Sequence, residues 1–523
     1  MKKRKILLIL TASIFVCSVL LFSACISTNK LAPPSFLGLD ENNLISWNEV
    51  DLARGYKLSI ENDKGEKNEI VTENTSYSLD TLDEGNYYLR VQAVGNARDI
   101  KDSDWSAAYD FQKGYTTGLV YELIENETAY AIVNVGRASG EVVIEDTYRN
   151  DKPVIKIGDR AFKNNKKITK VTLGANIVSV EKEAFYSCSS LQEIIIPEGV
   201  TSMGEAVFQS CSALKSVKLP STLSTVPQKA FAYCRNMEMV EFCVDKVDPD
   251  DENTWSGTTI IDDSAFVDCR AIKELVLPET LTGIESGAFR QMAELTRVVI
   301  NDKVSYINSE AFNSDAKLTD VVISENSNIN FIGVQAFSGC IALETIYLPE
   351  KLDEIARMAF YNCSSLDNIK IPDSVTIVGV NAFKNTKEYT EQTKVAGAPE
   401  QTKKNFKFID RWLVEYVGDK KTLANFNTRY PNYQPERDGE KGIVGIATGC
   451  FSSCEKLASV VIPKSVRYLS PSAFAKCKEL ASLSFEDGSD IQVIGAYCFM
   501  YDTEITSVAL PEGLKTIKMY AFY

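Results

Sequence analysis

The sequence predicts a mainly β fold, in which a solenoid of units of about 23 residues follows a β-sandwich. The first observation is a phenylalanine, usually preceded by alanine, that recurs at intervals of mostly 23 residues. Self-similarity at a fixed period of this size is the signature of a repeat architecture. The second observation is that residues 34–112 lack this period and contain short alternating runs instead. The recurring phenylalanines are Phe162, Phe185, Phe208, Phe231, Phe266, Phe289, Phe312, Phe337, Phe360, Phe383, Phe451, Phe474, Phe499 and Phe522.

Each repeat unit contains one short predicted strand. In the unit that follows Phe185, Ile194 and Ile196 alternate with a period of two, which predicts a strand with one buried face. Pro197 ends this strand, because proline cannot donate a hydrogen bond to a β-ladder. A single unit is too small to bury its apolar side chains, whereas stacked units bury them against one another. The repeats therefore predict a continuous stack of coils.

The unit pattern, L-x-x-I-x-I-P followed by A-F-x-x-C, resembles the leucine-rich repeat in its BspA-like bacterial surface form. The resemblance covers about residues 152–523. Departures are local: Val207, Cys450 and Cys498 replace the alanine before the phenylalanine. The resemblance implies a leucine-rich repeat solenoid and a surface protein that adheres to a host or neighbouring-cell protein. It does not identify the ligand, because such scaffolds carry different sites on the same fold.

The N-terminus resembles a bacterial lipoprotein signal peptide at residues 1–24. A basic segment, Lys2–Lys5, precedes the apolar run Ile6–Phe22, and the segment closes on Ser-Ala-Cys at Cys25. The resemblance implies a lipid on Cys25 that anchors an extracytoplasmic protein to the bacterial membrane at the cell surface. The alternatives are an ordinary signal peptide or a membrane-spanning anchor. Residues 25–33 are expected to form a short tether.

Residues 34–112 are predicted to form the β-sandwich, with strands at Leu44–Trp47, Tyr56–Ile60 and Tyr87–Val94. Trp47 and the motif L-x-x-G-x-Y that ends at Tyr87 resemble features of a fibronectin type III domain. The domain is interpreted as a spacer, with a docking module as the alternative. Residues 119–151 are rich in strand-forming residues but out of phase with the repeat, so we expect them to cap the N-terminal end of the solenoid.

Two insertions interrupt the predicted array of residues 152–523, one near residues 243–257 and one near residues 388–440. The first is rich in carboxylates, but it lacks the glycine and the distal glutamate of an EF-hand loop. A solvated loop is therefore favoured over a calcium site. The second contains an alternating run with Trp412, followed by a segment with three further aromatic or basic side chains: Arg429, Tyr430 and Tyr433.

Most cysteines occupy one slot of the repeat, three residues after the phenylalanine. Asn165, Met292, Asp315, Thr386 and Asp502 take the same slot, so the slot does not require a disulfide. We expect small buried side chains with free thiols. Disulfides between adjacent coils are the alternative, if the Cα atoms approach within roughly 4.4–6.8 Å.

Composition argues against an enzyme and against nucleic-acid binding. The formal net charge of −15 lacks the basic footprint of a nucleic-acid-binding protein. The chain has no histidine, which excludes histidine-activated nucleophiles and histidine-bearing zinc sites. No pattern indicates a catalytic residue, a metal ligand or a cofactor.

The candidate ligand-binding residues form two competing sets. The first is an outward-facing row on successive strands, Val276, Val299, Val322 and Tyr347, which is typical of a protein-binding patch if its apolar side chains are exposed. The second is the insertion with Trp412, Arg429, Tyr430 and Tyr433, residue types that are enriched at binding hot spots. The expected partner is an unknown extracellular protein, bound by the row, or a glycan or cell-wall polymer, bound by the insertion.

Overall fold

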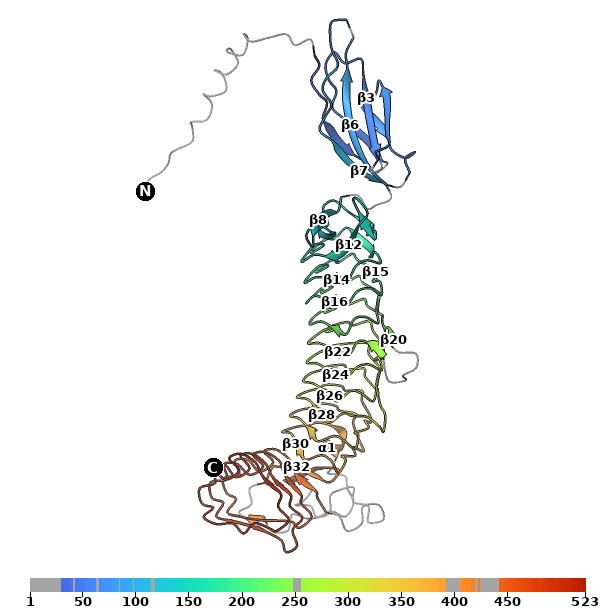
Figure 1. Cartoon of the computed structure of the whole chain (residues 1–523). Helices are drawn as coiled ribbons and strands as arrows, with labels where there is room; N and C mark the ends of the chain where they lie inside the picture. Colours follow the sequence, from blue (N-terminus) through green and yellow to red (C-terminus); the bar gives the residue numbers. More distant parts are fainter. Residues whose placement is uncertain are drawn as a thin grey trace, which may run out of the picture. The chain divides into compact units, whose positions relative to one another are not determined.

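The computed structural model describes residues 30–40, 43–62, 65–83, 85–96, 98–113, 118–247, 255–391, 405–418, 422–423 and 442–523. The chain divides into two compact units, residues 1–115 and 116–523 (Figure 1). The predicted signal peptide and Cys25 lie outside the described residues. Within those residues, no helix combines the length and the apolar character needed to cross a bilayer.

The first unit is a β-sandwich of two antiparallel sheets. Its core includes Trp47, Leu58, Leu89 and Val91, all almost fully buried, and the Trp47 ring packs edge-on against Tyr56 at 5.7 Å. The likeness of this unit to a fibronectin type III domain stays a prediction. One sheet holds β1 (Phe36–Leu39), β2 (Leu44–Trp47) and β5 (Ser76–Ser78); the other holds β4 (Lys67–Thr72), β3 (Gly55–Asn62), β6 (Gly85–Val94) and β7 (Tyr109–Lys113).

The second unit begins with an antiparallel hairpin of β8 (Val120–Ile124) and β9 (Ala129–Asn134). Strand β9 then pairs in parallel with β12 (Lys152–Ile157), and β12 pairs in parallel with the next coil. The hairpin thus supplies the first strand of a parallel stack and covers its edge. A short strand, β11 (Thr147–Tyr148), pairs antiparallel with β12 but is not part of the parallel stack.

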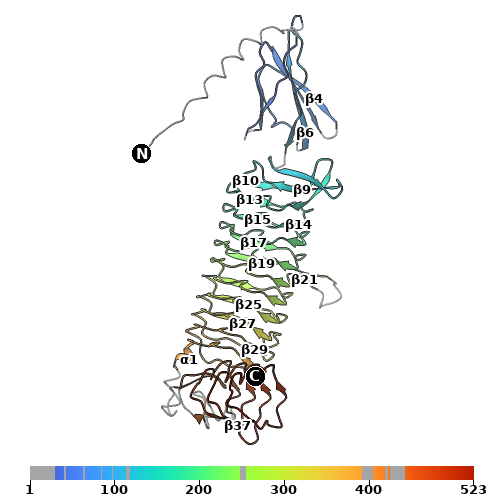
Figure 2. The same cartoon turned by 90° about the vertical axis from the view of Figure 1, so that its left-hand side faces the viewer.

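Most of the following coils contribute one strand to each of two faces (Figure 2). On one face, β10 (Gly140–Val143) of the predicted cap is followed by the strands predicted from the repeat: β13 (Ile168–Thr172), β15 (Glu193–Ile195), β17 (Ser216–Leu219), β19 (Met239–Phe242), and then β23 (Glu274–Val276), β25 (Arg297–Ile300) and β27 (Asp320–Ile323). On the other lies a two-residue strand: β14 (Ser179–Val180), β16 (Ser202–Met203), β18 (Thr225–Val226), β22 (Ile260–Ile261), β24 (Gly283–Ile284), β26 (Tyr306–Ile307), β28 (Phe331–Ile332), β29 (Glu354–Ile355) and β30 (Ile377–Val378).

The repeated phenylalanines stack face to face through the core, as the repeat predicts. From Phe162 to Phe383, neighbouring ring centroids lie 4.6 to 5.6 Å apart with interplanar angles of 17° or less. From Phe162 to Phe360, the backbone N–H of each phenylalanine also donates to the next coil; that of Phe185, for example, bonds the Val207 carbonyl at 2.8 Å. The stacked rings and the backbone hydrogen bonds therefore set the same distance between neighbouring coils.

The cysteine slot adds a second bond between coils, which the sequence did not predict. The Cys188 thiol donates to the Phe162 carbonyl at 3.0 Å, and the equivalent bonds recur from Cys211 to Cys477. The described cysteines are free thiols, and burial raises the pKa of Cys363 to about 12. Asp315 fills the slot differently: its carboxylate accepts the Met292 N–H at 2.7 Å, and burial raises its pKa well above the usual range.

The second insertion contains a new cap, and a second run of coils follows it. Strands β31 (Phe406–Ile409) and β32 (Trp412–Tyr416) form an antiparallel hairpin, and β32 pairs in parallel with β34 (Gly445–Ile446). This is the order of β8, β9 and β12, and both β12 and β34 end five residues before a stacked phenylalanine. The remaining elements are α1 (Lys387–Glu391), β33 (Thr422–Leu423), β35 (Ser459–Ile462), β36 (Tyr468–Leu469), β37 (Ser482–Phe485), β38 (Val493–Ile494) and β39 (Thr516–Ile517).

The first insertion begins and ends in a short antiparallel ladder of β20 (Val244–Lys246) and β21 (Trp255–Gly257). The residues between them that carry most of the carboxylates, 248–254, lie outside the described residues.

The stack makes a direct prediction for Phe289, which is fully buried between the rings of Phe266 and Phe312. Phe289→Ala is expected to lower the free energy of unfolding by about 3–5 kcal/mol, through lost transfer energy and a cavity. Urea denaturation measures the change. Phe522→Ala is the matched control, because this side chain fills the same slot but is 40% exposed, so it should cost much less. Equal losses for the two variants would contradict the shared core.

Candidate binding face

The outward residues of β23, β25 and β27 form the valine row: Val276, Val299, Val322 and, one coil further, Tyr347. The parallel register places Val276 beside Val299 and Val299 beside Val322. Because strand residues alternate, their neighbours Leu275, Val298 and Val321 are buried. Val276 is 62% exposed and Tyr347 is 38% exposed, whereas Val299 and Val322 are half-buried. The structure therefore places all four predicted residues on one face.

A ladder of charges runs beside the valine row, two residues earlier on the same strands. Arg297 bonds Glu274 at 2.5 Å on one side and Asp320 at 2.9 Å on the other. The hydrogen bonds to the two carboxylates raise the pKa of Arg297. One guanidinium faces two carboxylates, so the ladder keeps a net charge of about −1, and the row itself is the apolar part of the face.

The sheet that carries the row ends after β27. Residues 345–348 and 368–371 continue the coils in the same slots of the repeat, but they are not paired as strands. Two carboxylates take the place of a next strand: Glu388 of α1 accepts the Ile369 N–H at 2.7 Å, and Asp410 accepts the Ile371 N–H at 3.1 Å. Burial raises the pKa of Glu388. These two side chains thus cap the end of the first run of coils.

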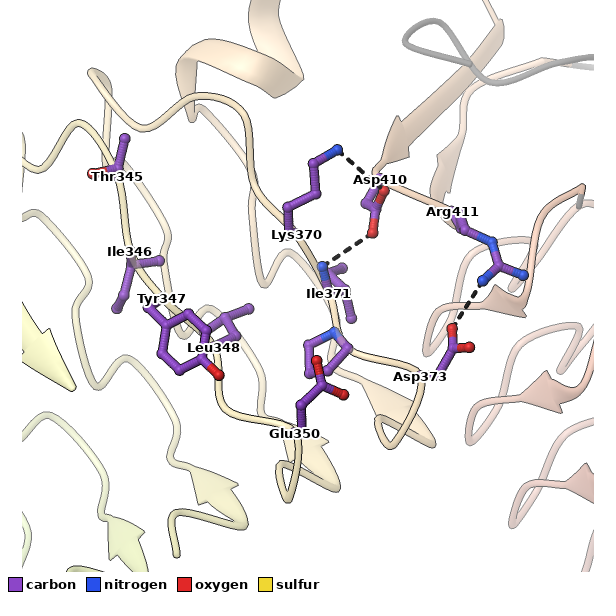
Figure 3. A pocket seen from close by; sticks show the side chains of 11 residues that line it. Thr345, Ile346, Tyr347, Leu348, Glu350, Lys370, Ile371, Asp373, Asp410 and Arg411 are labelled. Carbon is purple, nitrogen blue, oxygen red and sulfur yellow. Dashed lines mark hydrogen bonds and ion pairs between the residues drawn. The ribbon is translucent and has the colours of Figure 1, made fainter. Parts of the chain in front are cut away.

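A pocket of about 600 Å³ opens where the valine row reaches this end (Figure 3). Tyr347 belongs both to the row and to the pocket wall. The other walls come from the next coil and from the turn between β31 and β32. The lining residues are Thr345, Ile346, Tyr347, Leu348, Glu350, Lys370, Ile371, Pro372, Asp373, Asp410 and Arg411.

The charged groups of the pocket are unequally paired. Arg411 donates to Asp373 at 2.8 Å, and Lys370 lies 3.7 Å from Asp410 (Figure 3). Asp410 is almost buried, whereas the side chains of Lys370 and Asp373 are more than half exposed. Glu350 is exposed and has no hydrogen bond or ion pair with any residue that the structure describes. The pocket therefore presents one unpaired carboxylate beside an exposed tyrosine.

The prediction that Trp412 binds a ligand is wrong. Its side chain is fully buried, with the ring stacked on Tyr468 at 6.3 Å and packed over Gly445, where a Cβ atom would lie 2.5 Å from the ring. Trp412 is a core residue of the second cap. Arg429, Tyr430 and Tyr433 lie outside the described residues, so their predicted role stays a prediction.

Sequence reasoning missed the pocket residues Glu350, Asp373, Asp410 and Arg411. The available signal was the Asp-Arg pair immediately before Trp412, in the insertion that follows the first run of coils. Within the described ranges, no group of three or more cysteine, aspartate or glutamate side chains could hold a metal ion.

Comparison with known proteins identifies the repeat. The family model described as "BspA type Leucine rich repeat region" matches residues 147–251, 256–390 and 439–523. No curated protein matches the chain.

Several solved structures are similar to parts of this chain. A leucine-rich cell surface protein from Faecalibacterium prausnitzii is 20% identical, with 73% of this chain and 96% of that chain covered and a TM-score of 0.31. The pneumococcal vaccine antigen PcpA is 16% identical, with coverage of 72% and 97% and a TM-score of 0.39. A leucine-rich repeat protein of T. pallidum is 21% identical, with coverage of 44% and 91% and a TM-score of 0.32.

The carboxylate caps generate a prediction for the end of the binding face. Glu388→Ala or Asp410→Ala leaves a backbone N–H of the last coil without its acceptor, so each is expected to lower the free energy of unfolding by about 1–3 kcal/mol. Glu388→Gln keeps an acceptor oxygen and should lose less. Urea denaturation measures the changes, with Glu344→Ala, an exposed carboxylate two coils from the hairpin, as control. An effect of Glu344→Ala as large as the other two would refute the capping role.

Proposed function

Because the chain belongs to the BspA-type leucine-rich repeat family, we propose that it is a non-enzymatic surface scaffold that binds another protein through the valine row and the adjoining pocket. The observation that carries the proposal is the row itself, an apolar line across successive strands that ends at a pocket with an exposed tyrosine. An exposed apolar patch rimmed by polar groups is typical of a protein-interaction site.

The rigidity of the face also supports protein binding. Val276, Val299 and Val322 lie on strands whose inner side chains belong to the continuous core, and the central strand β25 pairs with β23 on one side and with β27 on the other. A preorganised surface loses little conformational entropy on association, so more of the contact energy appears as affinity. The favoured role is adhesion to a protein of a host or of a neighbouring cell.

Carbohydrate or cell-wall binding is the second candidate. Its strongest residue was Trp412, whose burial leaves that ring unavailable to a sugar. Of the aromatic residues assigned to the insertion, Tyr430 and Tyr433 remain candidates. The exposed ring of Tyr347 would be an alternative platform, but it adjoins an apolar row rather than further exposed rings.

We also propose that the protein is held outside the cytoplasmic membrane by a lipid on Cys25. The basic, apolar and Ser-Ala-Cys pattern of residues 2–25 supports this location. Mass spectrometry of the N-terminus of protein isolated from its native membrane should find a diacylglyceryl cysteine. A mature product that begins at another residue would refute the lipid anchor.

The binding role is tested by placing charge on the row. Residues 26–523, with and without Val299→Asp and Val322→Asp, would be applied to a panel of host-matrix proteins and to a glycan array. We expect the unmodified chain to bind a protein and the double variant to lose that binding while its circular dichroism and unfolding midpoint stay close to those of the parent.

Val461→Asp is the matched control, because Val461 is half-buried at the equivalent outward position of β35. It should leave binding unchanged. Binding that survives the double variant would overturn the role of the row, and binding to glycans alone would favour the second candidate.

A further inference from the structure

We propose that the pocket at the end of the valine row receives a lysine or arginine side chain of an extended protein segment. This inference rests on the proposed protein-binding function and specifies the chemistry of the partner. It is carried by three features of the pocket: an unpaired carboxylate, an exposed aromatic ring beside it, and a stretch of backbone without hydrogen-bond partners.

The carboxylate is that of Glu350, which lies three residues after Tyr347 on the same coil. The pocket contains three carboxylates, Glu350, Asp373 and Asp410, against the two cations Lys370 and Arg411. Arg411 pairs with Asp373, and Lys370 pairs with Asp410. Glu350 therefore has no counter-ion among the described residues. A cation that enters the pocket gains this pairing, whereas an anion meets the unpaired carboxylate. The net charge of −15 on the chain acts in the same direction.

The aromatic ring is that of Tyr347, which is drawn beside Glu350 in Figure 3. A guanidinium or ammonium group over the face of a tyrosine is attracted by the ring quadrupole. The long apolar stem of a lysine or arginine side chain suits the rest of the wall, where Ile346, Leu348 and Pro372 supply hydrophobic contact. The pocket therefore matches both parts of a basic side chain.

The backbone of residues 345–347 supports an extended partner. In the coils before it, the equivalent residues are paired in the β27 sheet, but the N–H and C=O groups of these three residues make no hydrogen bond with any described part of the chain. Thr345 and Tyr347 are exposed. Where such unpaired polar groups reach the surface between the coils, they can bond the main chain of an extended segment that crosses the face, while the pocket takes one of its side chains.

Peptide pools test this inference on residues 26–523. Fluorescently labelled nonapeptides would carry lysine, arginine, norleucine or glutamate at the centre, with randomised flanks, and fluorescence polarisation would measure their binding. We expect the lysine and arginine pools to bind about fivefold or more tightly than the norleucine and glutamate pools, as one partly exposed charge pair and one cation–π contact would give.

Variants identify the site. Glu350→Gln should remove most of the preference for basic pools, and Tyr347→Ala should weaken them while Tyr347→Phe keeps the ring and the binding. Glu279→Gln is the matched control, because Glu279 follows the repeat proline in the same slot as Glu350 and is also exposed, yet it lies outside the pocket. It should change nothing.

The inference would be overturned if all pools bound equally, or if the glutamate or norleucine pool bound most tightly. It would also be overturned if Glu350→Gln left the preference for basic pools unchanged, or if the protein bound glycans but none of the peptide pools. The variant with Val299→Asp and Val322→Asp separates this failure from that of the proposed function. If that variant loses protein binding while the pools show no basic preference, the scaffold function stands and the pocket assignment falls. If basic pools bind through Glu350 while protein binding ignores the row, the pocket assignment stands and the role of the row falls.

Discussion

The contact between one coil and the next is the constraint on which the rest of the second unit depends. At every coil from Phe162 to Phe360, a buried ring lies on the next ring, and the backbone N–H of the same residue bonds the following coil. Dispersion, burial and hydrogen bonding thus act at one spacing, and the thiol-to-carbonyl bonds of the cysteine slot reinforce it. Stability in such a stack is approximately a sum of coil and neighbour contributions, so a fault at one coil weakens those beside it.

This constraint determines where function can lie. The inward positions must stay apolar and of nearly constant size, but the outward positions of each strand face solvent and can differ from coil to coil. Val276 and Tyr347 are tolerated there because nothing in the stack depends on them. The pocket arises where the first run of coils must end: Glu388 and Asp410 replace the missing strand, and the turn that carries Asp410 also brings Arg411 to the face. The turn that helps to cap the last coil therefore also forms a wall of the candidate site.

The sequence was sufficient for the repeat, the strand in most units and the buried phenylalanines, because a period of 23 residues repeats the same local pattern many times. The sequence could not show that Trp412 is buried. Alternation predicts a strand with two faces, but it does not reveal that Tyr468 and Gly445 cover the face that carries the indole. Nor could it show the pocket, which joins Tyr347 to Arg411 across 64 residues through the pairing of a second cap. The role of the cysteine thiols as donors was also hidden, because Asp315 and Met292 in the same slot suggest only tolerance of small or flexible groups.

The buried thiols allow the central claim, a single shared core of stacked coils, to be measured directly. Pulsed alkylation at increasing urea, read out by mass spectrometry, reports when Cys188, Cys211, Cys234, Cys269, Cys340 and Cys363 become accessible. The account predicts that all six stay unreactive in native buffer and that neighbouring thiols become reactive over the same range of urea. Rapid alkylation of single coils in native buffer, or recovery of these cysteines as disulfides, would contradict it.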